Sequence, residues 1–187
     1  MSSARFTVAA VLAGLIGLAG LTGCNLDDTS VSSTGATTAP GQAAGTGGAS
    51  AGGGASQGAK QAQYGEVLQI SKGGEVAATV SVAAPKAVGS FFGGMSTPTS
   101  GPAFATFMVS FTSAKSGFDV NPFDFFVRTP DGARVQATIG CEPEFNAATL
   151  GQGEKFQGCL TVDAAHGTLV DTSGLLTSTS LIEWPGF

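Results

Sequence analysis

The chain has 187 residues, of which 42% are hydrophobic and 11% are charged, and its formal net charge at pH 7 is −5. This length is enough for one domain with a hydrophobic core. Residues 64–187 carry six Lys or Arg side chains and eleven Asp or Glu side chains. A scattered, acidic set of charges argues against nucleic acid and against electrostatic binding to an anionic membrane surface, because both need clustered cations.

The N-terminus has the layout of a secretory signal. Residues 1–7 contain one cation, Arg5, and residues 8–21 form an apolar run without charge. As a helix this run of about 14 residues spans about 21 Å, which is shorter than the hydrocarbon core of roughly 30 Å. A permanent transmembrane helix is therefore the weaker interpretation, and we predict a signal peptide over residues 1–23.

A cysteine stands directly after this apolar run. The stretch Leu21-Thr22-Gly23-Cys24 resembles the lipobox of bacterial lipoproteins. In that family the cysteine thiol receives a diacylglyceryl group, the preceding peptide is removed, and the acylated cysteine anchors the protein in the membrane. The resemblance implies lipidation at Cys24 and a location at the outer face of the cell membrane. The alternative is an ordinary secreted protein cleaved near Gly20 or Gly23, with Cys24 as an incidental thiol.

A tract of low complexity follows the cysteine. Residues 25–63 contain no Phe, Trp, Tyr or Ile and consist mostly of Gly, Ala, Ser, Thr and Gln. Such a composition buries too little apolar area to offset the entropy of ordering. We therefore predict a flexible linker over residues 24–63, with a root-mean-square reach of about 31 to 37 Å and a contour length of roughly 130 Å.

Residues 64–187 show the period-two alternation of β-strands. The sets expected to face the core are Val76, Ala78, Val80 and Val82; Ala105, Phe107, Val109 and Phe111; Phe123, Phe125 and Val127; Phe156, Leu160 and Val162; and Leu181 with Trp184. Residues 129–132, Thr-Pro-Asp-Gly, predict a hairpin turn into a strand over 133–139, and Gly158 predicts close packing by a neighbour. Short strands separated by turn signals predict an all-β, two-layer antiparallel sandwich.

Three segments of this part resemble a known family in series. They are Phe107 to Phe111, Asn121 to Val127 with the following Asp131-Gly132, and Leu150 to Lys155 running into Gly158 and Leu160. This series is similar to the immunoglobulin-like domain of unknown function found in many Gram-positive lipoproteins, in a superfamily that includes a secreted mycobacterial immunoprotective antigen. The resemblance implies an immunoglobulin-like fold and transfers no catalytic residues.

The remaining cysteines are predicted to form a disulfide. If Cys24 is lipidated, Cys141 and Cys159 are left as a pair in an oxidising compartment. Their loop encloses 17 residues, for which chain entropy predicts a stabilisation of about 3 kcal/mol. Cys159 alternates with Leu160 and Val162, so we expect the bridge on the outer face or rim of the sandwich.

We expect no enzyme, no cofactor and no metal site. His166 is the only histidine and lies in a turn-like segment without a nucleophile motif elsewhere in the chain. Asp119, Asn121 and Asp124 have oxygen ligands of the kind that calcium binds, but Pro122 interrupts them, and turn capping explains them better.

The segment Ser90 to Pro98 mixes bulky apolar residues with glycines. If exposed, Phe91, Phe92 and Met95 form a patch for a partner or a lipid; the favoured alternative is that they fold back as a lid on the core.

Two functional hypotheses follow. The first is a membrane-anchored immunoglobulin-like module that binds another envelope protein or has a structural role, without chemistry of its own. The second is a carrier of a small apolar or lipid ligand that uses Phe91, Phe92 and the interior of the sandwich.

Overall fold

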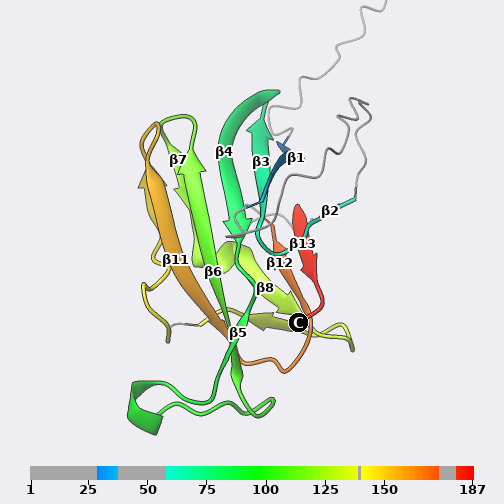
Figure 1. Cartoon of the computed structure of the whole chain (residues 1–187), viewed down its shortest axis with the longest axis vertical. Helices are drawn as coiled ribbons and strands as arrows, with labels where there is room; N and C mark the ends of the chain where they lie inside the picture. The colour runs from blue at the N-terminus through cyan, green and yellow to red at the C-terminus, as the bar shows by residue number, and fades with distance from the viewer. Residues whose placement is uncertain (1–28, 38–57, 139, 173–179) are drawn as a thin grey trace, which may run out of the picture.

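The computed structural model describes residues 29–37, 58–138, 140–172 and 180–187. The predicted signal peptide, Cys24 and residues 25–28 and 38–57 of the predicted linker lie outside the described residues. Almost all regular structure is β, and the fold is the immunoglobulin-like antiparallel sandwich that the sequence predicts (Figure 1). In the described part of the chain, no helix is long and apolar enough to span a membrane.

The larger sheet has the strand order β1-β3-β4-β6-β11, and β5 also pairs with β6. Its strands are β1 (Thr29–Thr37), β3 (Glu66–Lys72), β4 (Glu75–Val82), β5 (Lys86–Val88), β6 (Phe104–Ser113) and β11 (Lys155–Val162). All its pairings are antiparallel. Strand β6 holds three partners, because β11 lies along one side while β4 and β5 follow one another along the other.

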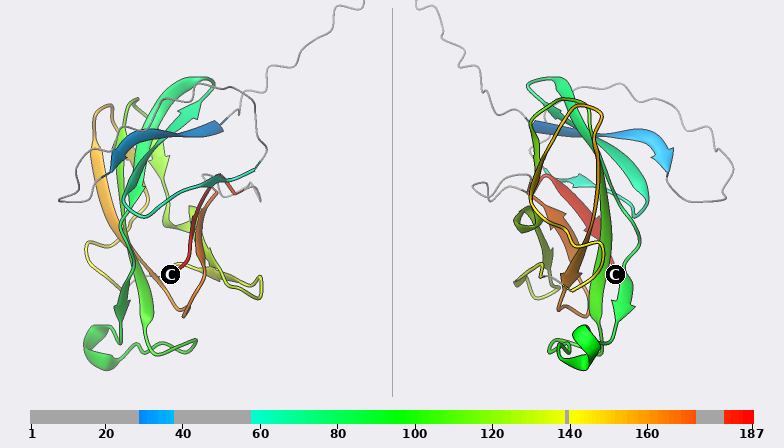
Figure 2. Two further views of the ribbon diagram at one scale, coloured as in Figure 1. Left: turned by 45° about the vertical axis from the view of Figure 1, so that its right-hand side comes forward. Right: turned by 90° about the vertical axis from the view of Figure 1, so that its left-hand side faces the viewer.

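The second sheet has the order β2-β13-β12-β8-β9 and faces the first (Figure 2). Its strands are β2 (Lys60–Gln61), β8 (Phe125–Arg128), β9 (Arg134–Gln136), β12 (Thr168–Asp171) and β13 (Ile182–Pro185). The pairing of β2 with β13 is parallel. A small pair of β7 (Phe118–Val120) and β10 (Ala148–Leu150) completes the strands, and the 3-10 turns are η1 (Phe92–Gly94) and η2 (Pro122–Asp124).

The predicted alternation holds where a strand is paired on both sides. In β6, Phe107 and Val109 are fully buried, and Leu160 of β11 lies opposite Phe107 and is also buried. Across the sandwich, Trp184 of β13 is fully buried, and it shares its face with Ile182 rather than with the predicted Leu181, which is only half-buried. Side chains at every second position therefore fill the space between the sheets.

Two local irregularities overturn single core assignments. Val76 is only half-buried, because the register of β4 against β3 shifts between Ile70 and Ser71 and leaves Ala77 as an extra residue. Phe123 is 57% exposed because it lies in the turn η2 rather than in β8. The Oδ1 atom of Asn121 accepts a hydrogen bond from the Phe123 amide at 3.0 Å and caps this turn. The predicted strand over 133–139 is also shorter, because β9 ends at Gln136.

Two parts of the predicted linker are strands: β1 and, at its end, β2 (Lys60–Gln61), which pairs with β13 and is followed by the buried Ala62. Residues 29–37 form β1, which pairs antiparallel with β3 from Thr29 opposite Lys72 to Thr37 opposite Glu66. Main-chain pairing holds this segment, and its one large apolar side chain, Val31, is half-buried against the core. Side-chain bonds add to the pairing: Ser33 Oγ donates to Glu66 Oε1 at 2.6 Å. The linker prediction is wrong for these residues, because a sheet edge accepts any extended backbone and requires no hydrophobic pattern.

Tyr64 joins the start of the first sheet to the last strand. Its hydroxyl donates to the Trp184 carbonyl oxygen at 3.2 Å, and its ring stacks on Phe107 with the ring centroids 6.3 Å apart. Burial raises the pKa of Tyr64 to about 12. The neutral phenol is therefore the form that the fold accommodates.

Gly158 allows the chain to pack closely at the edge of β11. A Cβ atom at this position would lie 2.7 Å from both Cα and Cβ of Phe145, so the backbone itself is in contact there. We expect Gly158→Ala to lower the free energy of unfolding by about 1 to 3 kcal/mol, because neither backbone can move away without disturbing the core. Chemical denaturation measures this change.

The matched control is Gly89→Ala, because a Cβ atom at Gly89 meets nothing within 4 Å. This exposed position should change stability by less than about 0.5 kcal/mol. Equal effects of the two substitutions would contradict the close packing at Gly158.

Candidate functional site

Cys141 and Cys159 form a disulfide, with their Cα atoms 5.6 Å apart. Cys159 lies opposite Met108 of β6, on the face away from Leu160, and is 7% exposed. The Cys159 amide donates to the Pro143 carbonyl oxygen at 2.7 Å, so the segment after Cys141 runs along the free edge of β11. The bridge thus lies at the rim of the sandwich and has a structural role.

The disulfide holds an aromatic residue in place. Phe145 lies within the segment between the two cysteines and is 4% exposed. Its ring centroid lies 4.9 Å from that of Phe156, 5.7 Å from that of Phe125 and 6.3 Å from that of Phe111. The segment between the cysteines therefore closes one edge of the core.

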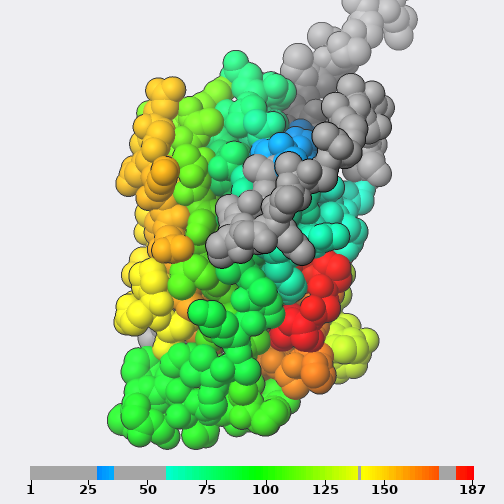
Figure 3. Space-filling model, viewed as in Figure 1, coloured from blue at the N-terminus to red at the C-terminus, as the bar shows by residue number. Residues whose placement is uncertain are grey.

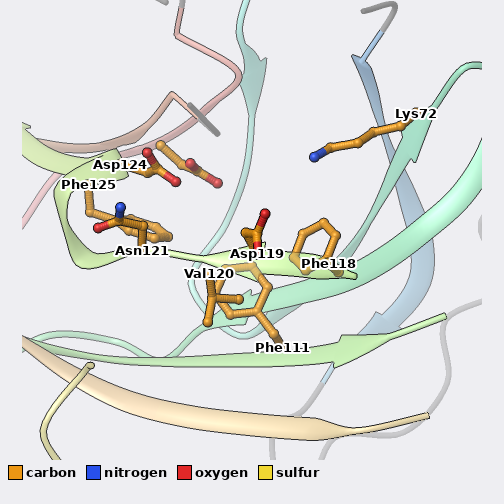
Figure 4. Close-up of a pocket in the computed structure, with 9 residues that line it drawn as sticks. Lys72, Phe111, Phe118, Asp119, Val120, Asn121, Asp124 and Phe125 are labelled. Carbon is orange, nitrogen blue, oxygen red and sulfur yellow. The ribbon is translucent and has the colours of Figure 1, made fainter. Parts of the chain in front are cut away.

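A small pocket lies between β7, η2 and the end of β12 (Figure 4). Asp119, Asn121, Asp124 and Asp171 contribute oxygen atoms, and the ammonium group of Lys72 approaches from the opposite wall (Figure 4). The pocket has a volume of about 20 Å³, which is room for about one water molecule. The structure thus brings together the three residues that the sequence analysis considered as calcium ligands.

The side chains of Asp119 and Asn121 have structural partners, and so does the main chain of Asp124. Asp119 Oδ1 accepts a hydrogen bond from Thr149 Oγ1 at 2.6 Å, which links β7 to β10, while Asn121 caps η2. The Asp124 main-chain oxygen accepts hydrogen bonds from the amide and hydroxyl of Thr172 at 3.0 and 3.1 Å. Within the described residues no His, Cys, Asp and Glu cluster is arranged to hold a metal ion. These contacts are those of turn and strand caps.

The loop between β5 and β6 is built around a tight turn. The Phe91 amide donates to the Ser96 carbonyl oxygen at 2.9 Å, and Gly93 and Gly94 adopt positive φ angles of 67° and 93°. Phe92 has a φ angle of 52°, which is uncommon for a bulky residue. The turn therefore directs the Phe92 side chain away from the strands.

The three apolar side chains of this loop do not behave alike. Phe91 is half-buried and packs on Phe104, with the ring centroids 5.2 Å apart. Phe92 is 60% exposed and Met95 is 89% exposed. The favoured alternative of a lid on the core is therefore correct for Phe91 and wrong for Phe92 and Met95. The exposed pair lies at the end of the sandwich opposite β1 (Figures 1 and 2).

Asp163 fixes the second half of this loop. Its carboxylate accepts hydrogen bonds from the Thr99 amide at 2.9 Å, the Thr99 hydroxyl at 2.5 Å and the Ser100 amide at 3.0 Å. Partial burial acts to raise the pKa of Asp163, but these hydrogen bonds outweigh it and hold the pKa below its usual range. The ionised carboxylate thus ties the loop to the end of β11.

A larger pocket of about 340 Å³ lies at the same end of the molecule. Its walls are mainly Ala, Pro and Phe side chains, among them Ala103, Phe104, Ala164 and Phe187. Figure 3 shows the green loop segment beside the orange and red segments that end at the C-terminus. Volumes of roughly 300 to 1,000 Å³ with apolar walls are typical of small-molecule sites.

This pocket could not be predicted from the sequence, because its walls come from three distant segments, residues 85–87, 102–105 and 164–166, together with Phe187. His166 was interpreted as a surface-loop residue, and it is exposed, with Nδ1 at 3.3 Å from the Phe187 carbonyl oxygen. The only local signal was the clustering of small residues, Ala103, Ala105 and Ala164-Ala165, which leave space where larger side chains would fill it.

The structure is a disulfide-bonded β-sandwich with an open, mainly apolar pocket at one end. No family model matches the sequence, and no curated protein matches it. Among solved structures, MPT63, a secreted protein from Mycobacterium tuberculosis, is similar with 17% identity and a TM-score of 0.54, over 70% of this chain and 99% of MPT63. At this identity the similarity shows a shared fold alone. This fold agrees with the immunoglobulin-like fold that the sequence resemblance implies. The similarity does not test the lipobox at Cys24.

Two Bacillus subtilis proteins show weaker similarity. The yjhA protein is 17% identical over 64% of this chain and 84% of its own, with a TM-score of 0.47. The ycdA protein, a candidate lipoprotein, is 16% identical over 59% of this chain and 37% of its own, also with a TM-score of 0.47. These scores are too low to support an inference for this chain.

Proposed function

We propose that this protein is a non-catalytic binding module of the cell envelope, held at the outer face of the membrane by a lipid on Cys24. The observation that carries the binding role is the exposure of Phe92 and Met95 at the tip of one loop. Large exposed apolar side chains on a loop fixed by a rigid sandwich are typical of protein interaction sites. The disulfide supports a location outside the cytoplasm, because structural disulfides persist in oxidising compartments.

The position of β1 determines how such an anchor would hold the domain. Four residues, 25–28, separate Cys24 from the first residue of β1. This spacing reaches about 18 Å at most, compared with roughly 130 Å for a linker that runs freely to residue 63. With β1 paired to β3, the anchored domain therefore lies close to the membrane, and the loop with Phe92 and Met95 at the opposite end points away from it.

Site-specific photocrosslinking tests the binding role. A photoreactive residue at Met95 in the full-length protein, in intact cells, should give one discrete adduct with another envelope protein, because this side chain is 89% exposed at the loop tip. The same photoreactive residue at Gln152, which is exposed in the turn before β11 at the other end of the sandwich, is the control. Identical adducts at both positions, or none at Met95, would contradict a binding surface at this loop.

The anchor has its own test. The intact mass of the mature protein should correspond to a chain that begins at Cys24 and carries acyl groups. Two or more acyl chains are needed because a single chain holds a protein at a membrane only weakly. Cys24→Ala should move the protein from the membrane fraction to the medium. An unmodified Cys24, or a mature chain that starts beyond residue 24, would remove the anchor and leave the loop surface unaffected.

The short spacing predicts how the domain responds to a change in β1. We expect Val31→Pro to release β1, because the proline replaces the half-buried Val31 side chain that packs against the core and its ring restricts the backbone of the strand. The lipidated protein is placed in vesicles that contain a fluorescent acceptor lipid. Energy transfer from Trp184, the single tryptophan, to this lipid should then fall, because the released domain lies farther from the membrane on average. A disulfide introduced between Ser32→Cys and Gln69→Cys, which are register partners, should leave the transfer at the wild-type level. Wild-type transfer as low as that of Val31→Pro would show that β1 is normally released.

The second candidate function is that of a carrier for a small apolar or lipid ligand. A specific observation favours it, namely the pocket of about 340 Å³ beside Phe104 and Phe187. The site differs from the one that the sequence predicts, because Phe91 and Phe92 do not line it and the sandwich interior is filled by side chains such as Phe107 and Trp184. Both functions use the same end of the sandwich.

A further inference from the structure

We propose that the disulfide controls the shape of the binding loop between β5 and β6. It acts through two positioning residues, Phe91 in the loop and Gly140, which directly precedes Cys141. This inference rests on the proposed binding function of the loop and adds how its surface is held in place. Partner binding should therefore depend on whether the two cysteines are bridged.

Phe91 fastens the first half of the loop to the sandwich. Its ring packs on Phe104 at the start of β6, with the ring centroids 5.2 Å apart. Its main chain closes the tight turn, because its amide donates to the Ser96 carbonyl oxygen at 2.9 Å and its carbonyl oxygen accepts from the Ser96 amide at 3.2 Å. The exposed Phe92 and Met95 lie inside this turn, so their position depends on where Phe91 is held.

The Phe91 ring also packs on the main chain at Gly140. A Cβ atom at Gly140 would lie 3.0 Å from Cδ2 and 3.2 Å from Cγ of this ring. The ring thus occupies the space in which any other residue would place its side chain. Glycine at this position allows the contact, and movement of the Gly140 backbone would remove support from the loop.

The disulfide holds the backbone at this contact. Cys141 follows Gly140 directly, and its bridge to Cys159 attaches it to β11. Strand β11 pairs with β6, which carries Phe104, the other support of the Phe91 ring. The bridge therefore links both supports of the ring to the same pair of strands.

Main-chain hydrogen bonds hold the same segment on either side of the bridge. The Thr138 amide donates to the Thr161 carbonyl oxygen at 2.7 Å, and the Pro143 carbonyl oxygen accepts from the Cys159 amide, also at 2.7 Å. These bonds do not need the disulfide, so loss of the bridge should loosen the segment without unfolding it. A partner must then order the freed Phe91 side chain, which weakens binding by about two- to tenfold.

The second half of the loop has separate attachments. The Asp163 carboxylate accepts hydrogen bonds from Thr99 and Ser100. Gly101 packs closely on another segment, because a Cβ atom there would lie 2.9 Å from the Cβ atom of Ala165. Neither attachment involves the disulfide. We therefore expect loss of the bridge to affect the tip of the loop and to leave its base in place.

The chemistry of this control is thiol–disulfide exchange. A dithiol transfers two electrons and two protons to the S–S bond, which becomes two thiols, while the dithiol closes to its own cyclic disulfide. An oxidising compartment favours the bridged form. The loop thus reaches its binding shape outside the cytoplasm, on the side of the membrane where the proposed function requires it.

Amide hydrogen exchange measures the position of the loop without a partner. The protein is the full chain with Cys24→Ser, so that the bridged pair supplies the only cysteines. Dithiothreitol should lower the protection of the Ser96 amide by about two- to tenfold, because local opening becomes easier. The control is Phe118→Ala, which removes a buried ring beside Phe111 near the other end of β6. It lowers the global stability but should leave the protection of the Ser96 amide unchanged.

Phe91→Ala tests the path from the bridge to the loop. This variant keeps the disulfide and removes the ring that contacts Gly140, so it should lower the protection of the Ser96 amide by a similar factor. Dithiothreitol should then have no further effect, because two changes that act through one contact are not additive. Additive effects would contradict transmission through Phe91.

If the reduced protein does not stay folded by circular dichroism, Gly140→Ala replaces reduction. Its methyl group displaces the Phe91 ring while the disulfide stays intact. The same loss of protection at Ser96 is expected, and unchanged protection would overturn the role of Gly140.

Photocrosslinking connects the shape of the loop to binding. With the photoreactive residue at Met95 in intact cells, Phe91→Ala should lower the adduct yield by about two- to tenfold. Replacement of both bridged cysteines by alanine should have the same effect. Phe118→Ala, again the control, should leave the yield unchanged.

The outcomes distinguish the role of the disulfide from the binding function. Unchanged protection of the loop in a folded, reduced protein overturns the inference and leaves the binding function intact. Protection that falls without a change in adduct yield also overturns it, because the shape of the loop would then not control binding. Absence of any adduct at the wild-type loop contradicts the binding function itself, while the exchange measurement still decides whether the disulfide positions the loop.

Discussion

The pairing of β6 with three other strands is the constraint on which the rest of the structure depends. Its inward side chains, Phe107, Val109 and Phe111, are at most 5% exposed, and each fully buried one stabilises the fold by about 1.5 to 3 kcal/mol relative to exposure. The same strand begins at Phe104 in the wall of the larger pocket and ends beside the turn that precedes β11. A single strand thus connects the core to the candidate binding end.

The fold could be predicted from the sequence because alternation reports burial directly where both sides of a strand are paired, as in β6. The prediction failed where backbone geometry interrupts the alternation. The bulge at Ala77 turns Val76 partly outward, and the capped turn at Asn121 puts Phe123 in solvent. Neither event leaves a clear pattern in the residues themselves. The disulfide could be predicted by counting, because one cysteine had another assignment and two remained.

The candidate site was less accessible to prediction, for a physical reason. The exposure of Phe92 depends on positive φ angles at Phe92, Gly93 and Gly94, which only a folded turn defines. The larger pocket depends on residues from distant segments, because its walls combine small side chains of residues 85–87, 102–105 and 164–166 with Phe187. Local patterns describe which residues are buried along one segment, but a cavity is a relation between segments, and the chain topology must be known before it can be seen.

The strand β1 shows how a segment without a hydrophobic pattern can still determine the position of a domain. Its pairing with β3 consists of backbone hydrogen bonds, a few side-chain bonds and the half-buried Val31, so it draws little stability from the core. An edge strand of this kind is among the first elements of a sandwich to open, because local opening requires the least buried area where contacts are few. If Cys24 bears the anchor, an edge strand with one half-buried apolar side chain also sets the distance from the membrane, and the exposed loop at the other end moves with the domain.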